Sequence, residues 1–135
     1  MKRFICVFMT LIMLLSVVSI PVLASDNSEI QPRYTYISGI AADITINTSL
    51  GTANCYGLIQ ARNKSVMLVC QLQQREDGQW KTVKSWSASG QDRVLLRNNY
   101  AVASGYTYRV LVNGYVYDSD YIIIERTLVE KIADY

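Results

Sequence analysis

The amino-acid sequence predicts an all-β protein, an antiparallel sandwich of seven short strands that follows an N-terminal signal peptide. Apolar and polar residues alternate with a period of two along most of the chain after residue 24, which is typical of half-buried strands. Turn signals separate these stretches at intervals of about 8–14 residues, as in sandwich domains. Beyond the N-terminus no window has a convincing helical period, although 128–134 is compatible with one helical turn.

The first 24 residues have the three parts of a secretory signal peptide. Lys2 and Arg3 make a positive start, and residues 4–18 are almost wholly apolar. The segment 22–24 (VLA) then places small residues before the cleavage site. We therefore predict cleavage after Ala24 and a secreted, extracellular product. The alternative is an uncleaved membrane anchor, because the apolar run is nearly long enough to span a bilayer.

Removal of the first 24 of 135 residues leaves a chain that suits one domain with one core. Residues 25–32 are polar and predict a flexible N-terminal arm, and residues 33–135 form the predicted sandwich. Loss of Lys2 and Arg3 lowers the number of Lys and Arg from 13 to 11, which equals the 11 Asp and Glu. A neutral protein has no long-range attraction for nucleic acid or an anionic membrane, so neither is expected as a partner of the mature form.

Two cysteines, Cys55 and Cys70, lie in the mature chain. An even pair in an exported protein predicts a disulfide, which would contribute about 3 kcal/mol by constraining the unfolded chain. Free buried thiols are the alternative. No metal site is expected, because the chain has no His and two isolated thiols do not make four ligands.

The predicted strands follow the order that the turn signals set. The first carries Ile44 and Ile46 on its apolar face and ends at the turn 49–51. The candidate turn 62–64 separates the second strand from the third, which carries Leu68 on its apolar face. The seven predicted strands are residues 40–47, 53–59, 66–72, 80–87, 94–100, 106–117 and 121–128.

Asp77-Gly78 predicts a two-residue hairpin turn between the third and fourth strands, because both central residues of a type I′ turn need φ > 0. This turn places Trp86 opposite Val69, on the outward face of the third strand. Trp80 shares that face, since it lies six positions before Trp86 and side chains repeat every two positions along a strand. A single β-bulge in the hairpin would turn side chains to the other face.

The sixth strand contains Asn113-Gly114, which is also a hairpin signal. If these residues form a turn, Tyr115 and Tyr117 face inward. If the strand continues, Val116 faces inward and the two tyrosines face outward. The unbroken alternation of valines around Gly114 favours the continuous strand, whose outward side chains then include Arg109.

The segment 102–110 (VASGYTYRV) resembles the corner at which strand F begins in fibronectin type III and immunoglobulin-like domains. There, a turn with Gly precedes a Tyr-x-Val strand, and the tyrosine hydroxyl bonds to upstream backbone. The resemblance implies an immunoglobulin-like sandwich with Tyr108 as a structural corner residue.

Three stretches, 32–37 (PRYTYI), 72–74 with 78–87 (LQQ and GQWKTVKSWS) and 105–110 (GYTYRV), are similar to a family of small secreted proteins of Gram-positive bacteria that has no assigned function. This resemblance implies secretion, an immunoglobulin-like fold and a turn near residues 118–120, and it implies no catalytic residues. Cys55 and Cys70 are too close in sequence for the usual disulfide of antibody domains, so we expect them to join neighbouring strands.

Most catalytic chemistries are disfavoured by residue types alone. Triads that depend on His are excluded because the chain has none, and phosphate-binding Gly-rich loops are absent. A pair of carboxylates could act in a glycosidase, but most candidates lie in or beside turns, where Asp is favoured for backbone reasons. These candidates are Asp43, Asp77, Asp92, Asp118 and Glu125. We predict no enzymatic activity, no catalytic residue and no cofactor.

The remaining candidate site is the predicted outward surface. Trp80, Trp86, Arg109, Tyr115 and Tyr117 would lie together on one sheet face. Flat aromatic rings beside polar groups suit a glycan or a partner protein. The sequence therefore predicts a secreted binding module of unknown protein or carbohydrate ligand. A secreted effector, such as a bacteriocin-like toxin, is the alternative, and structural core packing is the ordinary role of such aromatic residues.

Overall fold

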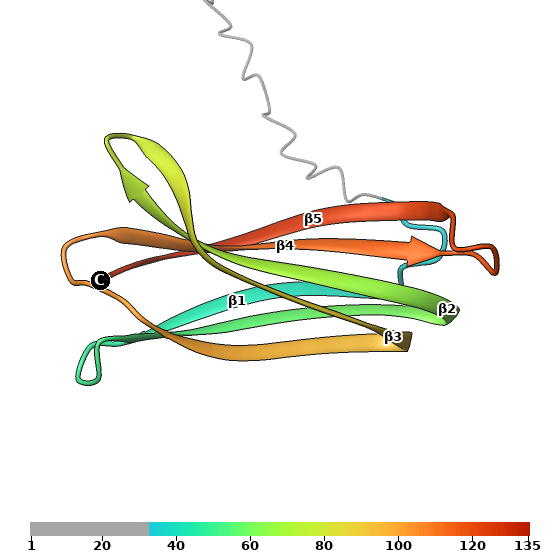
Figure 1. Cartoon of the computed structure of the whole chain (residues 1–135), viewed down its shortest axis with the longest axis horizontal. Helices are drawn as coiled ribbons and strands as arrows, with labels where there is room; N and C mark the ends of the chain where they lie inside the picture. Colours follow the sequence, from blue (N-terminus) through green and yellow to red (C-terminus); the bar gives the residue numbers. More distant parts are fainter. Residues whose placement is uncertain (1–32) are drawn as a thin grey trace, which may run out of the picture. The chain divides into compact units, whose positions relative to one another are not determined.

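The computed structural model describes residues 33–135, and this part of the chain is all-β, as predicted. It contains five antiparallel strands and no helix: β1 (Gly39–Asn47), β2 (Thr52–Glu76), β3 (Gln79–Ala101), β4 (Thr107–Tyr117) and β5 (Ile123–Asp134) (Figure 1). The predicted signal peptide and N-terminal arm lie outside the described residues. No helix of residues 33–135 is long and apolar enough to cross a membrane.

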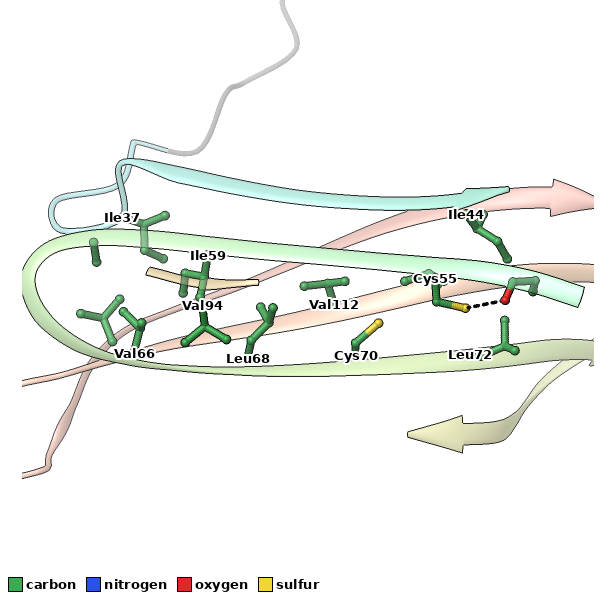
Figure 2. Close-up of a cluster of buried hydrophobic side chains, with 14 of the residues drawn as sticks. Ile37, Ile44, Cys55, Ile59, Val66, Leu68, Cys70, Leu72, Val94 and Val112 are labelled. Atoms are coloured by element: carbon green, nitrogen blue, oxygen red, sulfur yellow. Dashed lines mark hydrogen bonds between the residues drawn. The ribbon is translucent and has the colours of Figure 1, made fainter. Parts of the chain in front are cut away.

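The strands form one curled sheet because β2 and β3 are long and bend together. Residues 52–60 of β2 pair with β1 on one side and with residues 93–101 of β3 on the other. Beyond the bend, residues 65–76 of β2 pair with residues 79–91 of β3. Residues 65–74 also pair with β4, which pairs with β5. Figure 2 shows β2 doubling back on itself, so that its two halves face each other across the core.

Two polar residues with positive φ form the bend. Asn63 has φ 57° and Asp92 has φ 63°, values in the left-handed region that Asn and Asp adopt more readily than most residues. The backbone N–H of Asn63 donates a hydrogen bond to the Asp92 side chain and so ties the two strands at the bend. The predicted turn at 62–64 is therefore a bend within one strand. This is one reason why the structure has five strands and the seven predicted strands are not confirmed.

The C-terminal segment also differs from its prediction. Residues 128–134, expected to allow one helical turn, belong to β5, and Thr107 of β4 pairs with Asp134 near the end of the chain. Leu128 pairs with Asn113 and Ile132 with Arg109, so the ladder continues through the whole segment. Pairing with β4 overrides the weak local signal.

The core lies between the two halves of β2, where every second side chain points inward. It contains Ile37, Ile44, Ala53, Cys55, Ile59, Ala61, Val66, Leu68, Cys70, Leu72, Val94, Tyr108, Val110, Val112 and Val116. Asn113 and Gly114 lie inside β4, so the strand is continuous and the valines alternate inward as expected. A Cβ at Gly114 would lie 2.7 Å from Cδ1 of Ile59, which shows how closely the two layers approach there.

Tyr108 closes one end of the core and is almost fully buried. Its hydroxyl accepts a hydrogen bond from the backbone N–H of Ala103 (3.0 Å) and lies 2.9 Å from the Ala103 carbonyl oxygen, to which it can donate. Gln74 Oε1 lies 3.1 Å from the same hydroxyl. These local upstream bonds are those expected of a corner tyrosine.

Glu125 of β5 fixes the segment that precedes β1. Its carboxylate accepts hydrogen bonds from the backbone N–H groups of Thr35, Tyr36 and Ile37, at 2.7–2.8 Å. Burial of the carboxylate opposes its ionisation, but these three bonds outweigh burial and lower the pKa of Glu125. The start of the described chain is thereby attached to the strand that ends it.

Candidate binding surface

One outer face of the sheet, which we call the β4 face, collects most of the predicted site residues. It consists of the side chains that alternate with the buried ones on β4 and on the paired parts of β2, β3 and β5. Its main members are Trp80 of β3, Met67 and Val69 of β2, Arg109, Leu111, Tyr115 and Tyr117 of β4, and Leu128, Glu130 and Ile132 of β5. Gln73 of β2 lies among them in register but is buried beneath its neighbours.

Trp80 and Arg109 form an ordered cluster on this face. The Arg109 guanidinium carbon lies 4.5 Å from the Trp80 ring centroid, and that of Arg75 lies 5.9 Å away. Arg109 Nε donates a hydrogen bond to Gln73 Oε1 (2.7 Å), and its terminal nitrogen forms an ion pair with Glu130 (2.7 Å). The cation–π contact and the bonds together hold Trp80 and Arg109 in one arrangement before any ligand binds.

The tyrosines of β4 lie further along the same face. Two shallow hollows, of about 350 and 420 Å³, lie beside Tyr115. Tyr115 and Arg126 line both of them. Tyr117 lies beside a third hollow of about 510 Å³, and its hydroxyl is 3.6 Å from Sδ of Met67. The ring of Tyr115 thus lies between two depressions into which side chains of a partner could fit.

Trp86 is not part of this face, and its predicted outward position is wrong. The register of β2 and β3 shifts by one residue between Leu72 and Gln73, so Val83 is the extra residue of a bulge. Trp86 consequently pairs with the buried Cys70 and packs against the core, 6.4 Å from the Tyr100 ring. Trp80 lies between the bulge and the Asp77-Gly78 turn, so it keeps its predicted pairing with Arg75.

β5 also contributes to this face, which was not predicted from the sequence. Leu128 is 56% exposed and Ile132 is 48% exposed, both beside the outward residues of β4. Ile132 was missed because the seventh strand was predicted to end at residue 128, and Leu128 was missed because that strand was not assigned to this face. The alternation of Leu128, Glu130 and Ile132 is the signal that could have revealed them.

Cys55 and Cys70 are buried and their thiols are free in the structure. They lie on opposite halves of β2, and within the sheet Cys55 pairs with Ile44 and Asn98. The expectation that the two cysteines join neighbouring strands of the sheet is therefore wrong, because one long strand carries both. Burial raises the pKa of Cys55 to about 12 and that of Cys70 to about 11, so neither thiol ionises at neutral pH to act as a nucleophile.

Four of the five carboxylates considered for catalysis lie in turns or accept backbone N–H groups of other segments, and the fifth, Asp43, lies on the opposite outer face of the sheet. Asp118 Oδ1 accepts bonds from the backbone N–H groups of Asp120 and Ile122 in the turn between β4 and β5. Asp92 and Glu125 accept backbone N–H groups as described above, and Asp77 lies in the hairpin turn with φ 50°. Within residues 33–135 no group of three or more potential metal-ligating side chains is found.

No model of a known protein family matches this chain, and no curated protein matches it significantly. The resemblance to a secreted family of Gram-positive bacteria therefore stays a prediction, and the functional argument rests on the geometry of the surface.

Proposed function

We propose that this protein is a secreted, non-enzymatic binding module that holds a partner protein on its β4 face. The observation that carries the proposal is the row of large side chains on that face, from Trp80 through Tyr115 to the exposed Leu128 and Ile132. Tyr, Trp, Met and Arg are the residue types enriched in protein interfaces, and all four occur here.

A protein partner fits this face better than a sugar does. Arg109, whose guanidinium contacts the Trp80 ring, is already bound to Gln73 and Glu130. It therefore has little capacity left to bind the hydroxyl groups of a sugar. The neighbouring exposed side chains Leu128 and Ile132 are aliphatic and offer no hydrogen bonds to hydroxyl groups. Burial of aliphatic and aromatic surface is what stabilises a protein complex.

We also propose that the curled sheet is an immunoglobulin-like sandwich of seven strands. In this description the bends in β2 and β3 are corners between strands. One layer then contains residues 39–47, 52–60 and 93–101, and the other contains 79–91, 65–76, 107–117 and 123–134. The hydrogen bonds of Tyr108 to Ala103 support this description.

The exported protein, we propose, carries a disulfide between Cys55 and Cys70 that joins the two layers. Both side chains point into the core from facing halves of β2 (Figure 2). Bond formation removes one proton and one electron from each thiol, and the electrons reduce the disulfide of a thiol oxidant to two thiols. The oxidising conditions outside the cell favour this product.

Affinity capture with matched variants tests the proposed function. The purified protein is immobilised and incubated with proteins of the producing cells' surface and medium, and bound proteins are quantified by mass spectrometry. We expect a specific partner that Tyr115→Glu and Leu128→Glu reduce at least tenfold and that Leu95→Glu does not reduce. Leu95 is a suitable control because it is 39% exposed on the opposite outer face. Equal recovery by all variants, or no specific partner, would contradict the proposal.

A further inference from the structure

A second outer surface, which we call the β1 face, carries a polar hollow on the opposite layer. Cross-strand pairing aligns Asp43 of β1, Tyr56 of β2 and Arg97 of β3 in one row. The next row contains Thr45, Asn54 and Asn99. All six side chains alternate with inward residues such as Ile44 and Cys55, so they point away from the core.

The hollow has a volume of about 370 Å³ and is lined by Asp43, Thr45, Asn54, Tyr56 and Arg97, with Cys55 contributing beneath them. Neighbouring strands lie about 4.8 Å apart, and outward residues along one strand lie about 6.8 Å apart. Two rows on three strands thus cover roughly 10 by 7 Å, an area that one sugar ring with its hydroxyl groups would fill.

The side chains around Tyr56 supply both kinds of hydrogen-bonding group. The Asp43 carboxylate only accepts, the Arg97 guanidinium only donates, and the Asn54 amide and the Thr45 hydroxyl do both. Among residues 33–135 neither Asp43 nor Arg97 makes an ion pair. One oxygen of Asp43 accepts the backbone N–H of Ile44, and no hydrogen bond to the other is found in this part of the chain. These groups are therefore free to bind hydroxyl groups of a ligand.

The aromatic ring of this hollow is held in place before a ligand arrives. The Arg97 guanidinium carbon lies 5.3 Å from the Tyr56 ring centroid, a cation–π contact that restrains both side chains. Both residues still line the hollow, so both remain accessible. Because the aromatic side chain is already ordered, the site loses less conformational entropy when a ligand binds.

The charges of the hollow select among ligand classes. Asp43 and Arg97 balance each other, which disfavours a strongly charged ligand such as a phosphate or a polyamine. One carboxylate is too few for a calcium or magnesium site. A wholly apolar ligand would strip water from the Asp43 carboxylate and the Arg97 guanidinium without replacing its hydrogen bonds, which disfavours such a ligand.

We propose that this hollow on the β1 face is a carbohydrate site that takes a neutral sugar ring, with Tyr56 contacting the C–H face and Asp43 and Arg97 binding hydroxyl groups. The site is separate from the β4 face, so the protein would connect a glycan on one layer to a protein on the other. The two proposals stand independently, because neither uses a residue of the other.

Nuclear magnetic resonance titration of the purified protein tests this site. The probes are maltose, cellobiose, lactose and N,N′-diacetylchitobiose, with glucuronic acid as the charged comparison. We expect at least one neutral disaccharide to give saturable shifts at residues 43–45, 54–56 and 97–99. Tyr56→Ala should weaken binding at least tenfold, and Tyr115→Ala should leave it within twofold.

A second variant keeps the test decisive if Tyr56→Ala is poorly folded. Asp43→Asn preserves the size of the side chain but removes an acceptor charge, and it should weaken binding at least threefold without changing the spectrum elsewhere. The proposal is overturned if no neutral probe gives saturable shifts, if glucuronic acid binds more tightly than the neutral sugars, or if both variants bind as the wild type does.

Discussion

Cys55 and Cys70 face each other across the core, one from each half of β2, and both side chains are at most 2% exposed (Figure 2). A disulfide between Cys55 and Cys70 would therefore link the two layers covalently. Because burial keeps both thiols protonated, oxidation in the native state should be slow, and the disulfide should form mainly during folding.

We predict that the exported protein contains this disulfide and that the bond contributes about 3 kcal/mol to the free energy of unfolding. The measurement is mass spectrometry of alkylated protein from the medium, followed by urea unfolding with and without reductant. The double variant Cys55→Ala/Cys70→Ala should resemble the reduced protein, apart from a smaller loss from the vacated volume. Two alkylated cysteines in the secreted protein would refute the prediction.

The reduced protein should lose stability at alkaline pH. The folded-state pKa values, about 12 for Cys55 and about 11 for Cys70, lie above the ordinary value of 9.0. The protonated thiols therefore make their full contribution to the free energy of unfolding below pH 9. This contribution is lost as the pH rises towards 11–12, because the unfolded chain loses its thiol protons first. Urea unfolding between pH 8 and 11 should show a steeper fall for the reduced wild type than for the double Ala variant. Parallel curves would contradict this assignment.

The protein should become less stable at acid pH, because the Glu125 carboxylate is then protonated. Its pKa is lowered in the folded state because three backbone N–H groups bind the carboxylate. The stability from this interaction is present above the unfolded pKa of about 4.5 and is lost as the pH falls through the folded pKa. Glu125→Gln should cost about 1 kcal/mol at pH 7 and much less at pH 3. A cost that stays constant with pH would show that charge is not involved. Asp120→Asn, at an exposed position of the turn before β5, is the control.

Any side chain at position 114 should lower the stability of the protein. A Cβ at this position would lie 2.7 Å from Cδ1 of Ile59 and 3.2 Å from Cδ1 of Ile40, so the layers would have to separate. Gly114→Ala should cost about 1–3 kcal/mol, as overpacking does in other cores. Ser87→Ala, at an exposed strand position, should change stability by less than about 0.5 kcal/mol. Urea unfolding of both variants checks this, and equal stabilities would mean that the layers are less tightly packed than described.

Alternation predicted the β segments and most of the core, because a half-buried strand repeats every two residues. It also placed Tyr115 and Tyr117 outward, since the valines of β4 continue through Gly114. The bulge at Val83 could not be predicted, because an extra residue in a strand leaves no reliable mark in the local sequence, and it moved Trp86 to the core. The hollow on the β1 face was missed because its side chains come from three strands. Only the pairing register between these strands brings them together, and the local sequence does not show that register.

Tyr115 and Tyr56 lie on opposite outer faces and offer the most direct test of the central claim, that the β4 face binds a partner protein. The measurement is the Kd of the captured partner for the wild type, Tyr115→Ala and Tyr56→Ala, by titration calorimetry. We expect at least tenfold weaker binding for Tyr115→Ala, about 1.4 kcal/mol, and a change below twofold for Tyr56→Ala. Wild-type affinity in Tyr115→Ala, or a loss confined to Tyr56→Ala, would contradict it.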